Sequence, residues 1–224
     1  YLSNTAMQYY EKFTEAYKKN DAVAFNYFSD RFLSVIDMTD KVLNTHPEFL
    51  VGNWIEKAKD LGFEYNEDEF SKDMLERNAR ALITTWGSYR MAEQEYNHEG
   101  TSMWGQGVLV DYANRQYAGL TKDYYGKRWE IWINNLKDSF GQDYKDYTFK
   151  ENFELGWNWV LDKNNYSTEP SGDIKALAEE TFLNYGLDDD YRLKINVVRD
   201  DREAVEELYV HDGINQKIEV SLNE

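Results

Sequence analysis

Residues 25–43 have the sequence FNYFSDRFLSVIDMTDKVL, and this run determines the fold class. Large apolar side chains recur in it every three or four residues. They are Phe25, Phe28, Phe32, Val35, Ile36 and Leu43. Residues at this spacing lie on one face of an α-helix, so the run predicts an amphipathic helix with one buried face.

The same spacing recurs further along the chain, in residues 70–86, 129–140 and 174–185. The only two prolines are Pro47 and Pro170, which leaves long stretches free to form helix. We expect about seven helices and a break near Gly126. Their predicted ranges are 3–19, 21–44, 46–61, 67–86, 110–140, 148–163 and 172–185. Most of the predicted connections are short, which favours an all-α, antiparallel helical bundle.

The pattern changes after Gly186. Residues 191–197 alternate apolar and polar side chains as a half-buried strand does, and residues 208–222 resemble a hairpin. We therefore expect a helical domain over residues 1–186 and a linker with a short β-like C-terminal tail over residues 187–224. About 35 residues of strand do not make an independent domain, so the tail either packs on the bundle or begins a further module.

Composition excludes several classes of function. The 42 acidic residues outnumber the 25 basic ones, and the formal net charge is −17. This charge argues against binding to nucleic acid or to an anionic membrane surface. Cysteine is absent, and no apolar run approaches the roughly 20 residues of a spanning helix. The sequence begins with Tyr1, so we expect a processed product or a piece of a longer protein.

Motifs for catalysis are missing from this sequence. His46, His98 and His211 are scattered and fit no metal-ligand spacing, so we expect no metal site. There is no nucleophile elbow, phosphate loop or dinucleotide fingerprint, so we expect no cofactor. The chain by itself is predicted to have no catalytic residues.

One loop is long for a helical bundle and is a candidate for function. It runs from residue 88 to residue 110, contains Trp104, and lies between Trp86 and Tyr112 in the sequence. Both flanking aromatics are predicted at helix ends, where a ring can cover the C–H face of a sugar. The alternative is that both rings belong to the core at a helix crossing.

Four separated motifs resemble the C-terminal region of the α-N-acetylglucosaminidases, glycoside hydrolase family 89. They occur in the family's order within residues 5–185. The motifs are residues 49–55 (FLVGNWI), 78–87 (NARALITTWG), 111–120 (DYANRQYAGL) and 123–129 (DYYGKRW).

The resemblance implies an all-α domain that packs on a (β/α)8 barrel. Family members hydrolyse terminal α-linked N-acetylglucosamine with retention, using two glutamates of that barrel, and this chain shows no alternating βα pattern. In the family the helical domain lends aromatic side chains to the substrate pocket. Trp86 and Tyr112 match those positions, and Trp104 is a second candidate because the loop looks longer here and carries another Trp-Gly pair.

Together these features predict an accessory domain of a secreted or periplasmic bacterial enzyme. Its expected partners are the enzyme's own barrel and a glycan that ends in α-GlcNAc, a neutral one because an acidic wall repels a polyanion. Docking on a barrel also requires an exposed apolar patch. The alternatives are a stand-alone carbohydrate-binding helical module and a purely structural scaffold domain.

Overall fold

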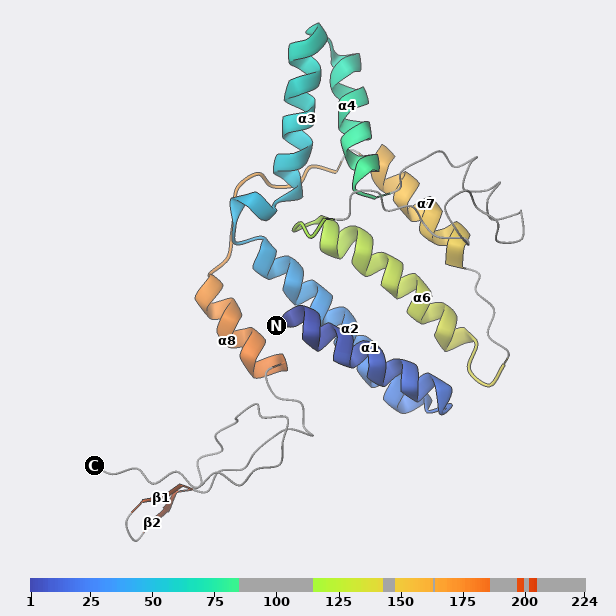
Figure 1. Cartoon of the computed structure of the whole chain (residues 1–224), viewed down its shortest axis with the longest axis vertical. Coiled ribbons are helices and arrows are strands. Elements are labelled where there is room, and N and C mark those ends of the chain that lie inside the picture. Colours follow the sequence, from blue (N-terminus) through green and yellow to red (C-terminus); the bar gives the residue numbers. More distant parts are fainter. Residues whose placement is uncertain (85–114, 143–147, 163, 186–196, 200–201, 205–224) are drawn as a thin grey trace. The chain divides into compact units, whose positions relative to one another are not determined.

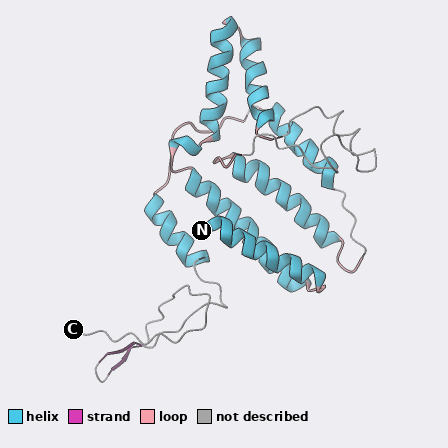
Figure 2. Cartoon of the chain, in the orientation of Figure 1, coloured by secondary structure: helices cyan, strands magenta, loops and turns pink. Residues whose placement is uncertain are grey.

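A computed structural model describes residues 1–84, 115–142, 148–162, 164–185, 197–199 and 202–204 (Figure 1). The all-α fold class is confirmed, because these ranges hold seven α-helices, two helical turns of other types and one short strand pair (Figure 2). None of the described helices has the combination of length and hydropathy that a membrane-spanning helix requires. The contacts divide the chain into two compact units, Tyr1–Asp173 and Ile174–Glu224.

The first helical hairpin consists of α1 (Leu2–Lys18) and α2 (Ala22–Leu43). Asp21 starts α2, since its carboxylate accepts a hydrogen bond from the Ala24 amide at 2.9 Å. The predicted apolar face of α2 is buried at Phe25, Phe32 and Val35.

Helix α6 (Lys127–Asp138) contributes two tryptophans to the same core. Trp129 packs edge-on against Phe32 at a centroid distance of 4.9 Å, and Trp132 packs against Phe13 at 5.9 Å. Edge-to-face packing of this kind adds to the stabilisation from burial alone.

The second hairpin consists of α3 (Val51–Asn66) and α4 (Glu69–Leu82), which run side by side (Figure 1). The predicted helix over 46–61 is wrong at its start. Pro47–Phe49 forms the separate 3-10 turn η1, and Leu50 is extended because it forms a parallel bridge with Ala118. Asp68 caps α4 by accepting a hydrogen bond from the Ser71 amide at 2.8 Å, so this helix begins at Glu69 rather than at residue 67.

The predicted helix over 110–140 also begins too early. Arg115–Tyr117 are not helical, and the π-helical turn η2 (Thr121–Gly126) runs directly into α6. Gly126 has φ −59° and ψ −43°, so the expected break there is absent from the described chain. The helix begins after Gly119, whose φ of +87° is a conformation that other residues adopt only with strain.

Helix α7 (Thr148–Leu161) is the last described helix of the first unit, and residues 164–173 after it have no regular structure. The second unit contains α8 (Ile174–Tyr185) and an antiparallel pair, β1 (Val197–Arg199) with β2 (Arg202–Ala204). In its register Val197 faces Ala204.

The described part of the tail is a short strand pair, but it is not the predicted hairpin. Of the predicted strand over 191–197 only Val197 is described, and it lies in β1, while residues 191–196 and the predicted hairpin over 208–222 lie outside the described residues. The units divide after Asp173, ahead of α8, whereas the sequence pattern placed a boundary after residue 186.

Candidate functional site

The predicted sugar-binding residues Trp86, Trp104 and Tyr112 all lie outside the described residues. Their positions therefore remain predictions. Two premises about their surroundings are corrected, since α4 ends at Leu82 rather than residue 86 and residues 115–117, within the predicted helix over 110–140, are not helical. What the structure does describe is how the chain is held on either side, up to Thr84 and from Arg115 onward.

Both sides are anchored in one core cluster. Its buried members are Val51, Ile55, Ile83, Leu120, Tyr124 and Trp159. Ile83 lies two residues before residue 85 and Leu120 lies six residues after residue 114, and the Tyr125 hydroxyl donates a hydrogen bond to the Ile83 carbonyl at 3.3 Å. The described chain on the two sides of residues 85–114 is thus held by the same cluster.

The described chain after residue 114 is held by Asp40 of α2. One carboxylate oxygen accepts hydrogen bonds from the Gly119 amide at 2.8 Å and the Lys122 amide at 3.0 Å. Burial raises the pKa of Asp40, and the nearby charge of Asp123 adds to the rise, while the two amide donors act in the opposite direction. Asp40 thereby serves as the cap of a helix that begins far along the chain.

The described chain before residue 85 is held by a buried arginine in α4. Arg80 is 1% exposed and pairs with Glu76, its Nε lying 2.9 Å from the carboxylate. Its Nη2 also donates to the Asn164 carbonyl at 2.9 Å. The guanidinium lies over the rings of Trp159 and Tyr166, at 5.0 Å and 5.9 Å from their centroids. These contacts neutralise and surround a charge that is costly to bury alone.

Residues 164–171 form a crossing segment that links these parts. The Trp159 indole donates a hydrogen bond to the Tyr166 hydroxyl at 2.9 Å, and the Ser171 amide donates to the Asn44 carbonyl at 2.9 Å. Gly52 lies so close that a Cβ there would come within 3 Å of backbone atoms of Tyr166 and Ser167. Sequence reasoning missed this segment, because its residues follow no periodic pattern.

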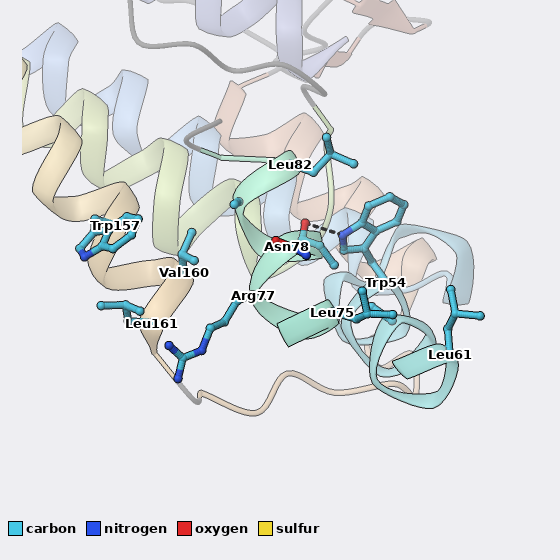
Figure 3. Close-up of a pocket in the computed structure, with 12 residues that line it drawn as sticks. Trp54, Leu61, Leu75, Arg77, Asn78, Leu82, Trp157, Val160 and Leu161 are labelled. Carbon is cyan, nitrogen blue, oxygen red and sulfur yellow. Dashed lines mark hydrogen bonds between the residues drawn. The ribbon is translucent and has the colours of Figure 1, made fainter. Parts of the chain in front are cut away.

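An open apolar groove of about 660 Å³ lies along α4, between α3 and α7 (Figure 3). Apolar side chains dominate its lining: Trp54, Ala58, Leu61, Leu75, Ala79, Ala81, Leu82, Trp157, Val160 and Leu161. Arg77 and Asn78 supply polar groups at the groove. The Trp54 indole is held by a hydrogen bond to the Ala79 carbonyl at 2.9 Å, which fixes its ring.

Further apolar side chains are exposed on the same hairpin. Tyr65 is 82% exposed and Phe70 is 75% exposed, and Phe63 and Met74 are also exposed. Soluble monomers rarely expose so many large apolar groups close together, so this hairpin is suited to contact another protein surface.

The described residues contain no group of three His, Cys, Asp or Glu side chains that could hold a metal ion. His46 accepts a hydrogen bond from the Glu48 amide through Nδ1 at 3.3 Å and caps η1, while His98 and His211 lie outside the described residues.

Comparisons with known proteins show the family of this chain. The family model described as Alpha-N-acetylglucosaminidase (NAGLU) C-terminal domain matches residues 1–184. Human alpha-N-acetylglucosaminidase is 34% identical over 149 residues, which are 65% of this chain and 17% of the human protein.

Solved structures of a family 89 glycoside hydrolase from Clostridium perfringens are also similar. The complex with PUGNAc is 39% identical with a TM-score of 0.66, and the match covers 82% of this chain and 20% of that one. A complex with GlcNAc-alpha-1,4-galactose, named as the substrate of that enzyme, gives the same values. This chain thus spans about a fifth of the length of these relatives. It belongs to the family of α-N-acetylglucosaminidase C-terminal domains, which are part of glycoside hydrolase family 89 enzymes.

Proposed function

We propose that this chain is an accessory helical domain of a retaining α-N-acetylglucosaminidase, without catalytic residues of its own. In the proposal it packs on the enzyme's (β/α)8 barrel and supplies aromatic side chains to the pocket for terminal α-linked GlcNAc. The observation that carries the proposal is the 39% identity, over 82% of this chain, to one fifth of a family 89 enzyme.

The apolar surface of the α3–α4 hairpin supports docking on the barrel. The groove beside Trp54 and the exposed rings of Tyr65 and Phe70 provide the kind of patch that an interdomain contact buries. Burying such side chains contributes roughly 25 cal/mol for each Å² of apolar surface removed from water.

Support for the pocket role comes from the way the chain is held around residues 85–114. Ile83 and Leu120 belong to one buried cluster, so the segment between them starts and ends at a rigid base. In the proposal Trp86 and Tyr112 cover the apolar face of the terminal sugar, and Trp104 is the second candidate. Orientation of a substrate by fixed side chains lowers the barrier by several kcal/mol.

The test replaces each candidate by alanine in the full-length enzyme. We expect Trp86→Ala and Tyr112→Ala each to lower kcat/KM for an α-GlcNAc disaccharide by more than about twofold. Tyr27→Ala, at an exposed position of α2, is the matched control and should leave kcat/KM unchanged. If both test variants stay within twofold of the parent enzyme, the pocket role is wrong.

The same variants distinguish the alternatives. A purely structural domain predicts that Trp86→Ala lowers the melting temperature without a selective loss of activity. A stand-alone carbohydrate-binding module predicts millimolar or tighter binding when the isolated chain is titrated with N-acetylglucosamine.

We further propose that the glycan is neutral and that the enzyme is a secreted or periplasmic bacterial protein. The net charge of −17 disfavours a sulfated polyanion within a Debye length of about 8 Å. GlcNAc-alpha-1,4-galactose, the substrate of the Clostridium perfringens relative, carries no charge. We expect a higher kcat/KM for neutral α-GlcNAc disaccharides than for sulfated heparan fragments, and the opposite preference would overturn this part.

A further inference from the structure

Tyr166 contacts both of the chain regions that flank residues 85–114. It lies in the crossing segment, is half-buried, and follows α7 rather than either flank. Burial raises its pKa, chiefly by desolvation of the phenol, so its hydroxyl stays protonated at neutral pH. A protonated hydroxyl can accept a hydrogen bond, and the Tyr166 hydroxyl accepts one from the Trp159 indole.

Before residue 85, Tyr166 contacts the last turns of α4. Its hydroxyl accepts the hydrogen bond from the Trp159 indole at 2.9 Å, and its ring lies beneath the Arg80 guanidinium together with that of Trp159. The Arg80 carbonyl in turn accepts a hydrogen bond from the Thr84 hydroxyl at 2.7 Å. Thr84 is the last described residue before the segment.

After residue 114, Tyr166 contacts the chain just before η2. Its ring packs on Gly119, where a Cβ would lie within 3 Å of ring carbons. Gly119 is also the residue whose amide is held by Asp40.

We propose that Tyr166 is a positioning residue of the glycosidase. Through Arg80 and Trp159 on one side and Gly119 on the other, it sets the spacing between the two points where residues 85–114 join the domain. The proposal rests on the function proposed above, because that segment carries the predicted sugar-binding aromatics.

The hydroxyl and the ring have separable roles in this arrangement. The ring fills space against Gly119 and Arg80, while the hydroxyl connects that ring to the Trp159 indole. Tyr166→Phe keeps the ring and removes the connection, so it relaxes the spacing without opening a cavity. A displacement of about 1 Å at a substrate-positioning group costs up to 10²-fold in rate, so even a small relaxation is measurable.

The experiment compares Tyr166→Phe with Tyr17→Phe in the full-length enzyme. Tyr17 is a matched control, because its hydroxyl is also part-buried and hydrogen-bonded, to Ser139 at 2.7 Å, but it belongs to the α1–α6 core. We expect both variants to lose similar thermal stability. We expect only Tyr166→Phe to raise KM for an α-GlcNAc disaccharide, by roughly three- to tenfold, with kcat within about twofold.

If Tyr166→Phe matches Tyr17→Phe in KM and kcat, the positioning role is overturned.

Trp86→Ala, measured in parallel, separates this result from the proposed function. If Trp86→Ala lowers kcat/KM while Tyr166→Phe does not, the positioning role fails and the pocket role stands. If Tyr166→Phe raises KM while Trp86→Ala and Tyr112→Ala have no effect, the aromatics named for the pocket are wrong.

Discussion

Replacing Gly52 by alanine tests the packing of the crossing segment directly. Gly52 lies in the first turn of α3, where alanine is normally a better helix former than glycine. Here its Cβ would contact the Ser167 carbonyl oxygen and lie 2.7 Å from both the Ser167 carbonyl carbon and the Tyr166 carbonyl oxygen. All three are backbone atoms, so no side chain can rotate away, and α3 or the crossing segment has to move.

The size of the effect follows from two opposing terms. Overpacking of this kind costs about 1–3 kcal/mol. The loss of chain entropy in the unfolded state returns about 0.4–1 kcal/mol. We therefore expect Gly52→Ala to lower the free energy of unfolding by roughly 1–2 kcal/mol. For a unit of this size that lowers the melting temperature by roughly 2–8 °C.

The measurement is thermal and urea unfolding followed by circular dichroism, with Gly126→Ala as the matched control. Gly126 also has helical dihedral angles, but a Cβ there would lie 3.4 Å from Ile36 Cγ2, which is close to ordinary contact. We expect Gly126→Ala to be neutral or up to about 1 kcal/mol stabilising. A Gly52→Ala protein that melts at or above the temperature of Gly126→Ala would refute the close packing of α3 against the crossing segment.

Two further predictions concern buried charges. Arg80→Met should lower the free energy of unfolding by about 3–5 kcal/mol, because it leaves the Glu76 carboxylate largely buried with only Lys59 at 3.7 Å, and urea unfolding that shows a loss below about 1 kcal/mol contradicts this. Asp40→Asn should change the pH dependence of stability. The pKa of Asp40 is raised in the folded state, so its favourable contribution is complete below the unfolded pKa and is lost as pH rises through the folded one. As the pH rises from about 3 to about 7, urea unfolding should show the free energy of unfolding of the parent protein falling relative to that of Asp40→Asn. A difference in the free energy of unfolding that stays constant over this range contradicts the raised pKa.

Local periodicity predicts the helices well because each buried face is written in consecutive turns. The apolar positions of residues 25–43 are enough to place α2, and Phe25, Phe32 and Val35 are buried as that pattern requires. The errors occur where distant residues intervene. Leu50 leaves the helical conformation to form a bridge with Ala118, and Asp40 caps a helix that begins after Gly119. No local signal identifies either partner.

The candidate site is likewise predictable from the sequence only in part. The family resemblance names Trp86, Tyr112 and Trp104, and these remain predictions because they lie outside the described residues. The groove and the Arg80 contacts depend on α4 meeting α7 and the crossing segment, which sequence spacing does not reveal. An arginine on a helix usually suggests a solvated face, yet Arg80 is almost fully buried.

The crossing segment also has a consequence for the order in which the first unit assembles. The α1–α2 and α3–α4 hairpins join neighbours in the sequence and can form early in folding. The segment that binds them together closes much larger loops, since Asn44 and Ser171 are 127 residues apart and Arg80 and Asn164 are 84 apart. During synthesis the hairpins are therefore complete well before the residues that lock them have left the ribosome. Until Tyr166 and Ser171 emerge, Gly52 and Arg80 face an unfilled position, and this interval is when the growing chain depends most on protection from aggregation.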